Sequence, residues 1–205
     1  MKSELKKVIP KQIKGGFHNT ESQKEFDTNE AAIQNFEILK QRFFSVHNWK
    51  SFCGEGFADF KLHDSSGHYV ERNPQQNDYI RIDIPGPGNF EAKGFEWVKI
   101  TEIIDYQNIE DRFEYILIIC KPTKSPDNKK NNHTAHFYSS SATSNFTIIR
   151  DGNRIETGIY GRNETPNFNA VFLDKLRNLG IALGGMIGFS KIQWKKLADG
   201  LLDFK

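Results

Sequence analysis

The chain has 205 residues, of which 37% are hydrophobic, and its 28 basic and 26 acidic side chains leave a formal net charge of +2. This near balance disfavours a nucleic-acid-binding protein, because such a protein carries a clearly positive domain. No apolar run approaches the roughly 18 residues that a membrane-spanning helix needs, so the sequence predicts no membrane span.

The first residues of the chain are polar and basic. Residues 1–20 show no sustained hydrophobic period, and we expect them to form a loosely held arm before a single domain over residues 21–205. Residues 1–7 lack the apolar core of a secretion signal, so the expected location is the cytoplasm. Cys53 and Cys120 are too few and too far apart for a disulfide framework or a redox pair.

A helix is predicted over residues 27–47. Asp27 is a suitable N-cap, and Glu30 three residues later completes a pattern like a capping box. Apolar residues then recur at three- and four-residue spacing, which is typical of one buried helix face. These residues are Ile33, Phe36, Leu39, Phe43 and Val46.

The middle of the chain reads as strands and turns. Residues 79–84 alternate between apolar and polar side chains, which is typical of a half-buried antiparallel strand. Residues 115–120 are apolar on both faces and predict a central strand. Asp151-Gly152 between two β-rich runs predicts a hairpin. The other predicted strands cover residues 58–62, 95–106, 112–121, 135–150 and 153–161, and residues 122–132 form a solvated loop.

The C-terminal part is predicted to be helical. Thr165 is a suitable N-cap and Pro166 occupies the favoured first position of a helix. An apolar stripe runs from Phe168 to Met186, and the glycines near its end could terminate or kink the helix. Ser190 with Gln193 forms a second capping box, which predicts the start of a last helix.

Helix, strands and helix in this order predict an α+β fold with about six to seven antiparallel strands. The order resembles the START/SRPBCC superfamily, whose helix-grip fold wraps an antiparallel sheet around a long, here possibly broken, C-terminal helix. The likeness rests on residues 46–49 after the first helix, on residues 77–84 as a mid-sheet strand, and on Trp194 with Leu197 and Leu201 in the last helix. The first strand of that fold is not evident, unless residues 23–26 supply it.

This resemblance implies an apolar cavity between the sheet and the C-terminal helix that holds a small hydrophobic or amphipathic molecule, such as a lipid. Members range from carriers to cyclases and hydrolases, so the fold leaves the function open. Ligand binding is the leading hypothesis. An enzyme that uses His136, Arg81 or Glu164 is the first alternative. A protein-interaction module that docks through residues 1–16 and 122–132 is the second. The sequence does not determine the oligomeric state.

Arg162 and Glu164 lie where the last predicted strand meets the following helix. An arginine there could bind an anionic head group, although both residues could equally fasten the junction by hydrogen bonds. Arg81 becomes a ligand contact only if its strand face lines the cavity. Aromatic residues make up 13% of the chain, and they can fill a core or line a cavity. The expected ligand-binding residues are Arg81, Trp97, Tyr115, His136, Tyr138, Arg162 and Glu164.

The sequence gives no strong sign of a metal or cofactor site. His133 and His136 have the most metal-like spacing, but residues three apart on a strand point to opposite faces and no third ligand is evident. No G-x-S-x-G nucleophile motif is present. We therefore expect a protein without metal or cofactor, and we assign no catalytic residue.

Overall fold

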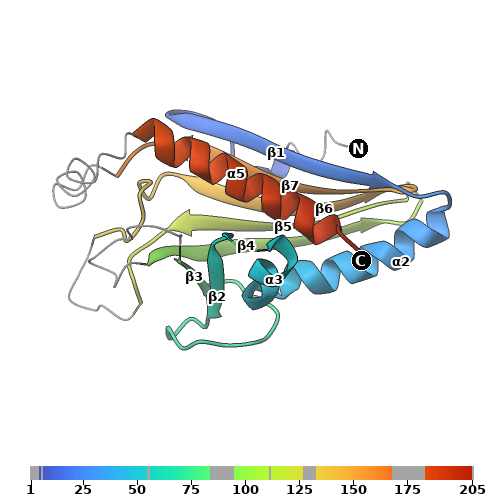
Figure 1. Ribbon diagram of the computed structural model, residues 1–205, viewed down its shortest axis with the longest axis horizontal. Coiled ribbons are helices and arrows are strands. Elements are labelled where there is room, and N and C mark those ends of the chain that lie inside the picture. Colours follow the sequence, from blue (N-terminus) through green and yellow to red (C-terminus); the bar gives the residue numbers. More distant parts are fainter. Residues whose placement is uncertain are drawn as a thin grey trace.

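The computed structural model describes residues 5, 7–54, 56–83, 95–110, 112–126, 133–167 and 183–204, apart from the side chains of residues 183–190. A curved sheet forms one layer, and three helices cover its inner face (Figure 1). The strands are β1 (Gly16–Glu25), β2 (Asp59–His63), β3 (Tyr79–Asp83), β4 (Glu96–Asn108), β5 (Phe113–Pro122), β6 (Thr143–Asp151) and β7 (Arg154–Glu164). The helices are α2 (Asn29–Phe44), α3 (Trp49–Cys53) and α5 (Leu183–Leu202), with a 3-10 turn η1 (Val46–Asn48) before α3.

The seven strands form one antiparallel sheet in the order β1-β7-β6-β5-β4-β3-β2. The chain thus runs from an edge strand through two helices to the opposite edge, and it returns strand by strand until β7 closes against β1. The final helix α5 lies across the sheet (Figure 1). This arrangement confirms the predicted α+β class and the helix-grip architecture.

The N-terminal boundary predicted from the sequence requires a correction. Residues 16–20, expected in a loose arm, form the first half of β1, which pairs with β7 from Gly16 to Glu25. This strand also supplies the first strand that the sequence did not reveal. Further upstream, Leu5 and Ile9 are buried against the outer face of the sheet, so this part of the N-terminal segment is packed against the domain.

Helix α2 confirms the predicted helix, with shorter bounds. Its N-cap is Thr28, not Asp27, because the Thr28 hydroxyl accepts a hydrogen bond from the backbone N–H of Ala31. The predicted apolar stripe faces the sheet with one exception, since Ile33 is 40% exposed. Trp49 at the start of α3 is fully buried, and its indole N–H donates to the carbonyl of Phe43.

The strand predictions are confirmed for β3, for β5 and for the hairpin at Asp151-Gly152. Ile80 and Ile82 face the core, and β5 is buried almost throughout, as expected of a central strand. Gly152 has a φ of +62°, which suits the tight turn into β7. The predicted strand over residues 135–150 is too long at its start, because β6 begins only at Thr143.

Helix α5 is continuous from Leu183 to Leu202, so Ser190 does not cap a separate helix as predicted. Gln193 serves a different purpose: it is buried, its amide donates to the carbonyl of Gly56, and its side-chain oxygen accepts from the N–H of Ala58. Gln193 therefore fastens α5 to the loop before β2. The predicted helix start is wrong at its first residues, because Pro166 forms an isolated β-bridge with Tyr138 and the Thr165 hydroxyl bonds to Ser139. The rest of the predicted helix, residues 168–182, lies outside the described residues.

Candidate functional site

The inner face of the sheet has two ends of different character. At one end, α2, α3 and the second half of α5 pack a hydrophobic core that includes Phe36, Trp49 and Leu197. The other, polar end, where β1 and β4 begin and β7 ends, holds buried polar side chains on these three strands. Burial of polar groups costs free energy unless they are hydrogen-bonded. The end beneath α2 also holds a buried ion pair, Arg150 with Glu114, but its members are hydrogen-bonded. A site is therefore sought where a buried polar atom lacks a partner among the described residues.

A buried histidine–carboxylate pair lies at this polar end. The Nδ1 atom of His18 on β1 is 2.9 Å from Oε1 of Glu164 on β7, and both side chains are less than 10% exposed. The Nε2 atom of His18 is buried and has no hydrogen-bond partner among the described residues. The pair thus leaves one strongly polar atom of the imidazole unsatisfied.

Two backbone features of β7 create the pair. Gly161 faces it directly, and a Cβ at this position would overlap the Glu164 carboxylate and the His18 ring. Asn163 has a φ of +55°, a left-handed conformation that non-glycine residues adopt infrequently. This conformation interrupts the strand alternation, so Arg162 and Glu164 point to opposite faces and not to the same one. Glu164 therefore reaches inward to His18.

Aromatic side chains surround the histidine. The ring of His18 stacks on Trp194 of α5, with ring planes only 7° apart and centroids 6.3 Å apart. Trp194 in turn contacts Phe60 of β2 and Phe146 of β6. The His18–Glu164 pair is thus a polar group set into an aromatic inner face, which suits a molecule that is mostly apolar and carries one polar group.

A second buried polar pair involves β4, at the same end of the sheet. Glu96 accepts a hydrogen bond from the N–H of Phe137 and lies 4.0 Å from Nδ1 of His136, which itself accepts from the N–H of Tyr138. Burial raises the pKa of Glu96 to about 8, although the hydrogen bond from Phe137 opposes this. Burial lowers the pKa of His136 to about 3. Both groups are therefore neutral near pH 7.

The structure does not bring the seven expected ligand-binding residues together. Arg81, Trp97, Tyr115 and Arg162 lie on the outer face of the sheet, away from α5. Arg81 and Trp97 are direct partners across β3 and β4, and the Arg81 guanidinium lies over the ring of Phe95. These four cannot line a cavity between the sheet and α5.

Glu164 and His136 belong to the two inner pairs, and Tyr138 is buried beside His136. Three of the expected residues thus lie at the polar end. The enzyme alternative needs at least two of His136, Arg81 and Glu164 in one pocket. His136 and Glu164 belong to separate pairs, however, and Arg81 lies on the other face. No group of three potential metal-binding side chains occurs within the described residues. No helix in that part of the chain is long and apolar enough to cross a membrane.

His18 is the residue that sequence reasoning missed. It was assigned to a loose arm because the residues around it are polar on both faces of β1. The available signal was the stretch of residues after Gly15-Gly16 without further glycine or proline, which is compatible with a strand.

Neither a family model nor a curated protein sequence matches this chain. Solved structures similar to it include major latex-like protein 151 from Panax ginseng, with 11% identity, a TM-score of 0.33, and coverage of 88% of this chain and 99% of the other. A protein from Thermus thermophilus has 10% identity and a TM-score of 0.33 over 91% of this chain and 95% of its own. A Staphylococcus epidermidis protein has 11% identity and a TM-score of 0.34 over 94% and 96%.

The helix-grip fold rests on the element order and sheet order of the chain itself. On that basis the resemblance to the START/SRPBCC superfamily is confirmed as a resemblance of fold.

Proposed function

We propose that this protein binds a small hydrophobic or amphipathic molecule at the polar end of the inner face, with a hydroxyl or N–H group of the ligand donating to His18. The observation that carries the proposal is the buried, unpartnered Nε2 atom of His18, held in place by Glu164 within the described part of the chain. A buried polar atom without a partner costs free energy, and a ligand donor would remove that cost.

The hydrogen bond to Glu164 sets the chemistry of the histidine. When Glu164 is ionised, its carboxylate can only accept, so Nδ1 of His18 then carries the proton of this hydrogen bond. In the neutral ring, Nε2 is then an acceptor with a free lone pair. A ligand that offers a donor at this position is favoured over one of the same shape without it.

The aromatic neighbours support the apolar part of the proposal. Trp194 is only partly buried and stacks on the His18 ring, so it offers apolar surface beside the histidine, whereas Phe60 and Phe146 behind it belong to the packed core. Apolar surface removed from water contributes roughly 25 cal/mol per Å². The bulk of the ligand would thus supply affinity, while His18 would supply selectivity for a donor group.

The first experiment is native mass spectrometry of the purified protein, followed by denaturing extraction of any bound molecule. A co-purifying amphipathic molecule supports the proposal and identifies its chemical class. The sharper test compares 2-naphthol with naphthalene, which differ by one hydroxyl. We expect 2-naphthol to bind about tenfold more tightly, the value of one buried hydrogen bond. Equal affinities would contradict a role for His18.

The matched variants are His18→Gln and His68→Gln. His68 lies on an exposed turn, so its replacement should leave both affinities unchanged. His18→Gln should reduce the preference for 2-naphthol. Because the comparison is made between two ligands on the same protein, a general loss of stability in the variant would affect both and leave their ratio informative.

A histidine that is oriented by a carboxylate is also the arrangement of a general base. The enzyme alternative thus stays open on Glu164, which was expected, together with His18, which was not. Recovery of a chemically altered molecule after incubation with the extracted ligand, abolished by Glu164→Gln, would favour an enzyme over a carrier.

A further inference from the structure

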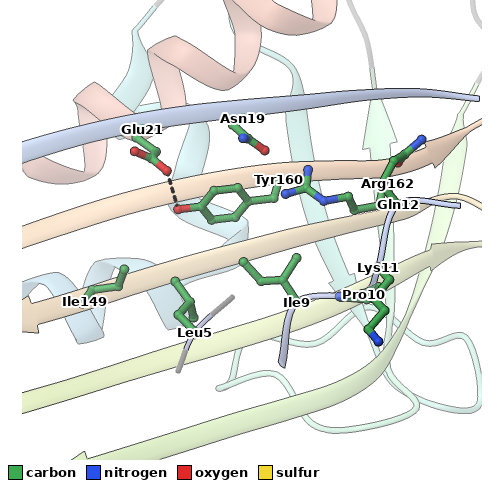
Figure 2. A pocket seen from close by; sticks show the side chains of 10 residues that line it. All are labelled: Leu5, Ile9, Pro10, Lys11, Gln12, Asn19, Glu21, Ile149, Tyr160 and Arg162. Carbon is green, nitrogen blue, oxygen red and sulfur yellow. Dashed lines mark hydrogen bonds between the residues drawn. The ribbon is translucent and has the colours of Figure 1, made fainter. Parts of the chain in front are cut away.

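A pocket of about 230 Å³ opens on the outer face of the sheet, opposite to α5 (Figure 2). The N-terminal segment forms one wall with Leu5, Ile9, Pro10, Lys11 and Gln12, and the sheet forms the other. At a liquid-water share of about 30 Å³ per molecule, the space corresponds to roughly eight waters, or to a ligand of roughly ten non-hydrogen atoms.

The pocket has an apolar floor and a polar mouth. Leu5, Ile9, Ile149 and Tyr160 are all less than 10% exposed and form the floor. The side chains of Gln12 and Asn19 lie beside the Arg162 guanidinium at the other end, in the view of Figure 2. This division matches a molecule with a short apolar tail and a polar head.

Arg162 is the group that defines the head. Its Nη1 donates to the carbonyls of His18 and Gly161, and it forms no ion pair with a carboxylate among the described residues. The guanidinium lies 5.6 Å from the centre of the Tyr160 ring and is partly buried. Desolvation by this burial lowers the pKa of Arg162. A bound anion would offset the free energy that desolvation of the guanidinium costs.

One acidic residue also lines the pocket. The Glu21 carboxylate accepts a hydrogen bond from the hydroxyl of Tyr160, so it lies at the far end of that ring from Arg162 (Figure 2). Glu21 is partly exposed to solvent, which screens its charge. Lys11 also lines the pocket, but its ammonium points away from Arg162 (Figure 2). The charge of Arg162 at the head end therefore favours an anion.

The wall provided by the N-terminal segment is fastened in place. The side-chain oxygen of Asn163 accepts from the N–H groups of Ile13 and Lys14 at 2.7 and 3.1 Å, and its amide donates to the carbonyl of Lys11. The backbone N–H of Asn163 donates to the side chain of Gln12. The pocket thus has two defined walls, which a loosely attached arm could not provide.

We propose that this outer pocket binds a small amphipathic carboxylate, with its anionic head on Arg162 and its tail between Leu5, Ile9 and Ile149. Arginine presents several N–H donors in a planar fork that matches a carboxylate, and two of its nitrogens remain to meet it here. The site is separate from the inner face and does not depend on the function proposed for His18.

The probe is octanoate, which has ten non-hydrogen atoms. A ligand of this size is expected to bind with millimolar affinity, so the titration should extend to about 10 mM. Two-dimensional NMR should show saturable shifts for the side-chain amide of Asn19 and the backbone N–H of Ile9. The indole N–H of Trp194 on the inner face should stay unchanged. 1-Octanol, which has the same tail without the charge, should bind about tenfold more weakly.

Arg162→Met keeps a long side chain without the charge and should weaken octanoate about tenfold while leaving 1-octanol unchanged. Arg81→Met is the matched control, because Arg81 is another outer-face arginine that does not line the pocket. If the Arg162 variant does not fold, the comparison of octanoate with 1-octanol on the unaltered protein still decides the question.

Two results would overturn the proposal: no saturable shift of Asn19 and Ile9, or equal affinity for octanoate and 1-octanol. Shifts confined to Trp194 would place octanoate on the inner face and would also contradict the outer site. Those shifts would leave the function proposed for His18 standing, so the two proposals can fail separately.

Discussion

The two ends of the inner face differ in how the polar atoms of their buried side chains are satisfied. At the packed end, Trp49 contacts Phe43, Phe60 and Phe146, and its one polar atom is satisfied by a backbone carbonyl. At the polar end, His18, Glu164, Glu96 and His136 have almost equally inaccessible side chains, yet they include a nitrogen without a partner in the described residues and a carboxyl with a raised pKa. Burial at the packed end stabilises the fold. Burial at the polar end desolvates polar groups, which costs free energy that the packing around them does not return.

The largest expected effect is at the packed end. Trp49→Ala removes a fully buried aromatic side chain and its hydrogen bond to Phe43. The free energy of unfolding should fall by about 3–5 kcal/mol, as measured by urea denaturation. His18→Gln should cost far less, because the ring that it replaces already lacks one partner among the described residues. Equal losses from the two variants would remove the distinction between the two ends.

The next effect concerns pH. Because the pKa of Glu96 is raised from 4.5 to about 8, the folded protein keeps a proton that the unfolded chain has lost above pH 4.5. Stability should therefore fall as the pH rises from about 4.5 to 8, by up to about 1.4 kcal/mol per pH unit.

Glu96→Gln keeps an acceptor for the N–H of Phe137 and cannot ionise. The free energy of unfolding of this variant, relative to that of the unaltered protein, should increase by roughly 2 kcal/mol between about pH 6 and pH 8. The lowered pKa of His136 acts in the opposite direction below pH 6.5, but it is common to both proteins and cancels in the difference. Parallel stability curves would show that Glu96 is already ionised in the folded state.

The last comparison concerns Gly161→Ala, whose main effect is expected on ligand preference. The new Cβ would displace the His18 ring and the Glu164 carboxylate, at a cost of about 1–3 kcal/mol. The preference for 2-naphthol over naphthalene should be lost. Gly158→Ala is the matched control, because its Cβ would meet Thr147 and Tyr160 on the outer face. If Gly158→Ala removed the preference equally, the effect could not be assigned to the His18–Glu164 pair.

Much of the fold could be predicted because its signals are local. The alternation of residues 79–83 and the Asp151-Gly152 turn depend only on neighbouring residues. β1 could not be recognised in this way, since it is an edge strand with polar residues on both faces. Its identity depends on pairing with β7, which lies far away in the sequence.

The candidate site was predicted less well, for a related reason. Alternation separates two faces of a strand but does not say which face meets the helices. In β5 both faces are apolar, so the sequence could not predict that Tyr115 lies on the outer face. Glu164 was identified, but its neighbour Arg162 was assigned to the same cavity. An asparagine permits the left-handed backbone found at Asn163 but does not require it.

That single residue also determines how the two proposed sites relate. Arg162 and Glu164 are separated only by Asn163, yet one lines the outer pocket and the other holds His18 on the inner side. At this point only the backbone of β7 separates the two proposed sites. Asn163 also ties down the N-terminal segment, so one backbone conformation maintains the inner pair, the outer pocket and the wall that covers it.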